Sequence, residues 1–142
     1  MKKLLALAAV TLSIGLPLAL DSPTTAHAAK WHQGTPKVLR GTWERNKRAG
    51  QGKYAFNAKL GVKITKKGLN SYWIGDPLVL GKMKYRKTSQ HVYVLKGIEM
   101  INSLKPYQVR IRRVGSRLKY QEYQLIKGHG HYTKATAWLP KK

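Results

Sequence analysis

Apolar and polar or small residues alternate without a break through residues 53–65. The apolar set is Tyr54, Phe56, Ala58, Leu60, Val62 and Ile64, and the intervening set is Lys53, Ala55, Asn57, Lys59, Gly61, Lys63 and Thr65. A period of two is the pattern of a strand with one buried side and one solvent-facing side, and it excludes an amphipathic helix. Because the run is longer than most strands, we expect a bend near Gly61.

Shorter runs of the same kind follow, separated by turn residues such as Gly, Pro, Asn and Ser. We expect strands at residues 71–74, 78–86, 91–96, 107–114, 117–125 and 132–139. Residues 97–105 differ, because Ile98, Ile101 and Leu104 recur at intervals of three before Pro106, which predicts a short helix or a wide loop. Seven or eight strands at this spacing predict an all-β fold, either a small antiparallel up-and-down β-barrel or a sandwich.

The sharpest local prediction is a hairpin whose two-residue turn begins at Gly115. A regular register through this hairpin places Glu122 on the apolar side, opposite Val109. We therefore expect one bulge, which sets Tyr123 opposite Val109 and leaves Glu122 on the outer face near Arg110.

The N-terminal residues have the order of a secretory signal peptide. Lys2 and Lys3 precede an apolar run to Leu20, and a small-x-small triplet ends at Ala28. We expect residues 1–28 to be a cleaved signal peptide, residues 29–37 a flexible leader and residues 38–142 a single domain. The expected location is secreted, extracellular or attached to the cell surface, with no transmembrane segment after cleavage.

Charge is the strongest compositional signal. The chain has 28 Lys and Arg against 5 Asp and Glu, a formal net charge of +23 at pH 7, and no cysteine. The absence of cysteine excludes disulfides and thiolate metal sites, so that stability has to come from the core. The charge predicts association with polyanions at low salt, such as wall polymers, acidic lipids or, nonspecifically, nucleic acid.

Many basic residues fall on the outward phase of the predicted strands. A solvated cationic face would by itself keep the sheet soluble and blunt its edges. The scarcity of acidic residues favours a functional contact, because mixed charges already suffice for solubility. The candidate polyanion-binding residues are Lys53, Lys59, Lys63, Lys82, Lys84, Arg86, Arg110, Arg112 and Lys119.

Gly41, Thr42 and Trp43 resemble the Gly-x-Trp signature in the first strand of the calycins, which include the lipocalins and fatty-acid-binding proteins. The resemblance implies a small closed barrel with Gly41 and Trp43 at its structural base, and either a filled interior or a cavity for a small apolar ligand. The whole chain also resembles uncharacterised small secreted basic proteins of Gram-positive lactic bacteria. That resemblance implies export and a β-rich domain, and it brings no activity.

Other chemistries find little support in the sequence. His129 and His131 would share a face of an extended segment, but a catalytic zinc site needs at least three placed ligands, so we expect no metal and no cofactor. No nucleophile elbow, carboxylate pair or phosphate loop is present, so we expect no enzyme. The predicted inward phase of most tyrosines argues against a platform for stacking nucleic-acid bases.

Three functions therefore remain open. The first is a secreted cationic β-barrel binding module that anionic wall polymers retain at the cell surface. The second is an extracellular lipocalin-like carrier of a small apolar ligand. The third is a cationic antibacterial protein, for which only residues 97–105 could supply an amphipathic helix.

Overall fold

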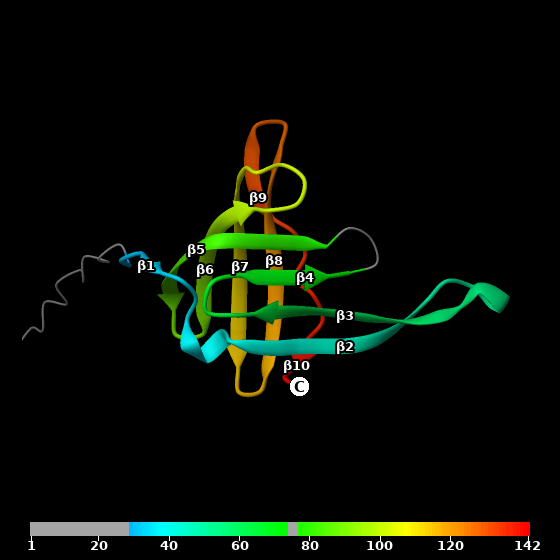
Figure 1. Ribbon diagram of the computed structural model, residues 1–142. Coiled ribbons are helices and arrows are strands. Elements are labelled where there is room, and N and C mark those ends of the chain that lie inside the picture. Colours follow the sequence, from blue (N-terminus) through cyan, green and yellow to red (C-terminus); the bar gives the residue numbers. More distant parts are fainter. Residues whose placement is uncertain (1–28, 74–76) are drawn as a thin grey trace, which may run out of the picture.

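The computed structural model describes residues 29–73 and 77–142, which form ten β-strands and two 3-10 turns (Figure 1). The predicted signal peptide and the turn expected at Gly75 and Asp76 lie outside the described residues. The elements are β1 (His32–Gln33), η1 (Lys37–Leu39), β2 (Gly41–Ala49), η2 (Gly52–Tyr54), β3 (Phe56–Ile64), β4 (Leu69–Tyr72), β5 (Leu78–Ser89), β6 (Val92–Glu99), β7 (Pro106–Val114), β8 (Arg117–Ile126), β9 (His129–Tyr132) and β10 (Leu139–Pro140).

The strands pair antiparallel in chain order from β2 to β8, which confirms the all-β, up-and-down prediction. The sheet folds over on itself, so that β2, β3 and β4 cross β7 and β8 at a steep angle (Figure 1). Within the described residues β2 and β8 do not pair with each other, and the C-terminal segment lies between them. Leu139 pairs with Leu118 of β8, and Lys141 forms a single bridge with Trp43 of β2. The sheet is therefore curled but not closed, and the barrel alternative is not formed.

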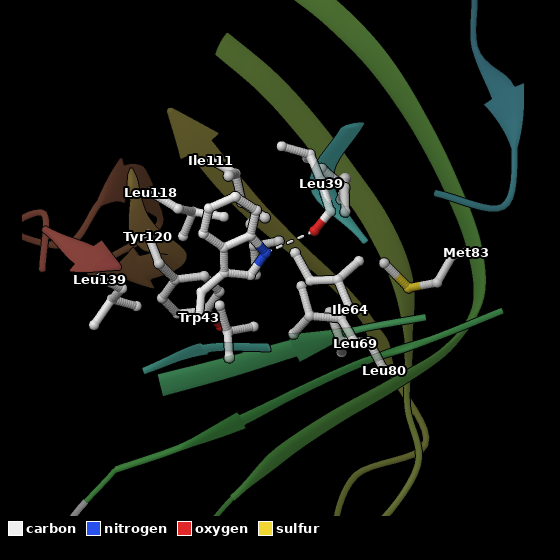
Figure 2. Close-up of a cluster of buried hydrophobic side chains, with 13 residues drawn as sticks. Leu39, Trp43, Ile64, Leu69, Leu80, Met83, Ile111, Leu118, Tyr120 and Leu139 are labelled. Atoms are coloured by element: carbon white, nitrogen blue, oxygen red, sulfur yellow. Dashed lines mark hydrogen bonds between the residues drawn. The ribbon is translucent and has the colours of Figure 1, made fainter. Parts of the chain in front are cut away.

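Trp43 is the centre of the core between the two halves of the sheet (Figure 2). Its side chain has no solvent exposure, and its indole N–H donates a hydrogen bond of 2.8 Å to the Leu39 carbonyl. Apolar side chains from both halves surround it: Val62, Ile64, Leu69, Leu80, Met83, Leu95, Val109, Ile111, Leu118, Tyr120 and Leu139. The alternation in the sequence therefore buries the face of the sheet that lies within the body.

The hairpin of β2 and β3 extends beyond the body as a twisted arm (Figure 1). We define the arm as residues 45–60. At its root, a Cβ on Gly61 would lie 2.7 Å from the Glu44 Cβ, so the two strands approach closely there. Farther out, Tyr54 and Phe56 are 74% and 53% exposed. The strand predicted from residue 53 is therefore wrong at its start, where residues 52–54 form η2, and only the inner half of β3 reaches the core.

Strand β5 contains a bulge that the sequence analysis missed. The pairing with β6 shifts register between Gly81 and Lys84, and Lys82 adopts a left-handed backbone with a φ of 49°. The extra residue turns Leu80 and Met83 inward. Without the bulge, a regular alternation would have put Val79 on the buried face in place of Leu80.

The ambiguous segment 97–105 contains the end of β6 followed by a loop. The Glu99 carboxylate accepts hydrogen bonds from the backbone N–H groups of Ile101, Asn102 and Ser103. These three bonds lower the pKa of Glu99 from 4.5 to about 2. The alternative of a wide loop is therefore the one that forms, and a single carboxylate organises it.

The hairpin register at Gly115 is confirmed, but the expected bulge near Gln121 is wrong. Glu122 lies directly opposite Val109 and belongs to the inner face. Its carboxylate accepts hydrogen bonds from the Tyr107 and Tyr120 hydroxyls, at 2.8 and 3.2 Å. The two tyrosine hydroxyls supply polar partners for this partly buried carboxylate, so a regular register is tolerated there.

Residues 29–37, expected as a flexible leader, lie against the body. The short strand β1 pairs with β5 through His32 opposite Tyr85 and Gln33 opposite Lys84. The His32 and Tyr85 rings stack with their centroids 5.3 Å apart. This pairing carries the preceding residue, Trp31, onto the outer side of the sheet.

Candidate polyanion-binding face

The outward side chains of β5, β6, β7 and β8 form one basic surface. We call this surface the cationic face and define it by Lys84, Arg86, Lys96, Arg110, Arg112 and Lys119. Lys84 lies directly opposite Lys96, and Arg112 lies directly opposite Lys119. Like charges in opposed positions destabilise a sheet, so the face has unfavourable electrostatics that a bound anion would relieve.

Five of the nine candidate residues lie on the cationic face: Lys84, Arg86, Arg110, Arg112 and Lys119. The other four lie elsewhere. Lys53 and Lys59 are on the arm, Lys63 is exposed on β3, and Lys82 is in the β5 bulge. The sequence analysis missed Lys96, although it shares the outward phase of Val92 and Val94 and could have been found from that alternation.

Trp31 lies among three cations of the cationic face. Its ring centroid is 5.0 Å from Arg86 Cζ, 5.0 Å from Lys96 Nζ and 5.8 Å from Lys84 Nζ. These distances are those of cation–π contacts. The Arg86 Nε atom is buried without a hydrogen-bond partner. The site therefore combines three positive charges, one aromatic ring and one unsatisfied donor.

Two further aromatic side chains lie against basic residues of β7 and β8. The Arg110 guanidinium carbon is 4.0 Å from the Tyr132 ring centroid, and Arg110 Nε donates a 2.9 Å hydrogen bond to the Gln121 side-chain oxygen. Lys119 Nζ is 4.9 Å from the Trp138 ring centroid, and Arg117 is 5.9 Å from it. Four adjacent strands span about 15 Å, so these pairs and Trp31 form a row of about that width across the sheet.

The sequence analysis missed this row in part because it placed residues 132–139 in one strand, which is wrong: β9 ends at Tyr132, and residues 133–138 are irregular. Trp31 precedes the two-residue strand β1, and Trp138 lies in the irregular segment before β10. The predicted tyrosines are in part inward, as expected, with Tyr120 only 2% exposed. The aromatic residues beside the cations come instead from short or irregular segments that a period of two cannot identify.

The described carboxylates are all engaged away from the cationic face. Glu44 accepts a 2.7 Å hydrogen bond from the Tyr72 hydroxyl, and the Lys142 ammonium lies 3.3 Å from it, the single salt bridge within the described residues. The Tyr72 hydrogen bond lowers the pKa of Glu44, and burial with that bond raises the pKa of Tyr72 to about 12. Glu99 holds its loop and Glu122 lies inside. The described part of the chain thus leaves the cationic face without a carboxylate partner.

Packed side chains fill the space between the sheet halves, where a carrier would hold its ligand. Leu39, Trp43, Val62 and Leu95 have no exposure. Two depressions of about 570 and 560 Å³ are open to solvent and lie outside this core. A filled core between the sheet halves is the state that a barrel-like protein adopts when it carries nothing inside.

Gly41 and Trp43, expected at the structural base of a closed barrel, lie at the start of β2 in a sheet that is not closed. Trp43 is buried as described, and Gly41 has a φ of 130°, where a Cβ would lie 3.1 Å from Lys141 Cε. His129 and His131 are exposed on β9, and no group of three or more potential metal ligands occurs among the described residues. The described segments also include no helix with the length and hydropathy of a membrane span.

Comparisons with protein-family models, with curated proteins and with solved structures give no match for this chain. The geometry of the cationic face therefore carries the functional argument.

Proposed function

We propose that this protein is a secreted binding module whose cationic face binds anionic, phosphate-rich wall polymer and keeps the protein at the cell surface. The observation that carries the proposal is the row of three aromatic side chains, each against basic residues, on one surface that lacks a described carboxylate. A polymer bearing regularly spaced anions can contact such a row at several points at once. Binding by counterion release then gives both affinity and steep salt dependence.

The packed core argues against the alternative of an apolar-ligand carrier. Trp43 and Tyr120 fill the space between the sheet halves, with 0% and 2% exposure. The structure also argues against an antibacterial role by membrane insertion. The amphipathic helix expected for that role is not formed, because residues 100–105 are a loop held by Glu99. No catalytic constellation is proposed, since each described carboxylate has a structural partner.

The test is binding to purified phosphate-rich wall polymer across a salt series, with a neutral wall polysaccharide and an unrelated β-protein of equal charge as controls. We expect the binding constant to fall about a hundredfold or more between roughly 50 and 200 mM salt. We also expect the control protein to bind at least about tenfold more weakly at each salt concentration, because its charges are not arranged in a row. Equal binding by the control protein would reduce the cationic face to a generic tether and contradict the proposal.

A further inference from the structure

Three cations lie around the Trp31 ring, whereas the rings of Trp43 and Trp138 have two basic neighbours each. Lys84 and Arg86 come from β5, two residues apart and therefore on the same side of the strand. Lys96 comes from β6, directly opposite Lys84. All three lie within 5.8 Å of the Trp31 ring centroid. Three positive charges in so small a volume repel one another, and the described residues bring no carboxylate to them.

Arg86 has an incomplete set of hydrogen bonds in this cluster. Its Nε atom is buried and unpaired, although a buried N–H normally has a partner. Nε and one terminal nitrogen form the side-on fork with which arginine binds two oxygens of one oxyanion. The Arg86 fork is therefore incomplete beside the Trp31 ring, because its Nε donor has no partner.

We propose that Trp31, Lys84, Arg86 and Lys96 form a specific subsite for one phosphate group of a polyol-phosphate chain. Arg86 would bind two phosphate oxygens through its fork, and the two ammonium groups would neutralise the remaining charge. A tetrahedral phosphate presents oxygens in several directions, which suits cations converging from two strands better than a planar carboxylate does. The Trp31 ring would shift to admit the phosphate and pack against the attached polyol. This inference rests on the proposed function and names the ligand group of the same face.

The experiment follows the indole N–H signals of the uniformly 15N-labelled protein by NMR while glycerol phosphate is added. The chain has four tryptophans, and the Trp43 indole N–H is buried and bonded to the Leu39 carbonyl, so its signal is an internal reference for the fold. We expect the Trp31 signal to move and saturate, and the Trp43 signal to stay in place. The reference concentration is the phosphate concentration at which wall polymer saturates the protein. If glycerol phosphate at that phosphate concentration leaves the Trp31 signal unmoved, the subsite is overturned and the proposed function stays intact.

The matched variants are Arg86→Lys and Arg48→Lys, which both keep the net charge of the protein. Arg86→Lys removes the fork and should weaken saturation of the Trp31 signal about tenfold. Arg48→Lys, exposed on the arm and outside the cationic face, should change it less than about twofold. Equal effects of the two substitutions would overturn the proposal. A second outcome would also overturn the proposal. If a single-stranded oligonucleotide moves the Trp31 signal at a lower phosphate concentration than glycerol phosphate does, the ring serves base stacking.

Discussion

The cationic face and the arm carry similar charge in different surroundings. The arm has five exposed basic residues on its two strands and on η2 between them: Arg45, Lys47, Arg48, Lys53 and Lys59. The single cation–π contact on the described arm places Lys53 Nζ 5.2 Å from the Tyr54 ring centroid. On the cationic face the basic side chains lie against Trp31, Tyr132 and Trp138, and Arg86 and Arg110 are partly buried. On the proposed function, net charge alone does not define the binding site. Convergence, partial desolvation and an aromatic neighbour distinguish basic residues that can select a ligand from basic residues that only attract one.

The cationic face and the arm are both attached to one core, so a substitution in that core should have the largest effect on stability. Trp43→Ala removes the largest fully buried side chain, which lies in the core close to the root of the arm. We expect it to lower the free energy of unfolding by about 3–5 kcal/mol. Urea denaturation followed by circular dichroism measures this loss. Trp138→Ala is the control and should cost less than about 1 kcal/mol, since Trp138 lies on the outside. Equal losses would show that Trp43 does not centre the core.

A matched pair of aromatic deletions sharpens the comparison of the two regions. Trp138 contacts Lys119 and Arg117 on the body, whereas Tyr54 contacts Lys53 on the arm. Trp138→Ala should weaken wall-polymer binding about threefold, which corresponds to one exposed cation–π contact. Tyr54→Ala should leave binding unchanged within error. Isothermal titration calorimetry of both variants at fixed salt gives their binding constants for wall polymer. A larger loss of affinity for Tyr54→Ala would assign polymer binding to the arm in place of the cationic face.

Lowering the pH should reduce the stability of the fold without weakening polymer binding by the cationic face. The pKa of Glu99 is lowered from 4.5 to about 2, so its carboxylate stabilises the fold above pH 4.5 and this contribution disappears as the pH falls toward 2. The urea midpoint should therefore fall over that range, and it should fall less in Glu99→Gln. Polymer binding should not weaken between pH 7 and pH 4.5, because the cationic face is defined by Lys and Arg alone. A parallel loss of binding over the neutral range would point to a titrating group on the face.

Much of the fold could be predicted from alternation and turn residues. The strand through Val62 and the hairpin register at Gly115 follow from local patterns that tertiary contacts reinforce. The β5 bulge could not be predicted, because a left-handed Lys82 breaks the alternation without a glycine at that position. Glu122 was misplaced because its partners, two tyrosine hydroxyls, come from the folded sheet.

The candidate site could be predicted in part. Five of the nine basic candidates lie on the cationic face because strand phase places side chains correctly where the register is regular. Lys53 and Lys59 were grouped with them because a sequence does not show that the hairpin leaves the body. Trp31 could not be placed, since its position depends on the two-residue pairing of β1 with β5.

The most direct test of the central claim compares two triple variants of equal charge and composition. One neutralises the subsite on the cationic face with Lys84→Gln, Arg86→Gln and Lys96→Gln, and the other neutralises the arm with Arg48→Gln, Lys53→Gln and Lys59→Gln. Binding of each to phosphate-rich wall polymer is measured at one moderate salt concentration. We expect the face variant to bind at least about tenfold more weakly than the arm variant. Equal loss in both variants would contradict it, because binding would then follow net charge and not the arrangement of the cationic face.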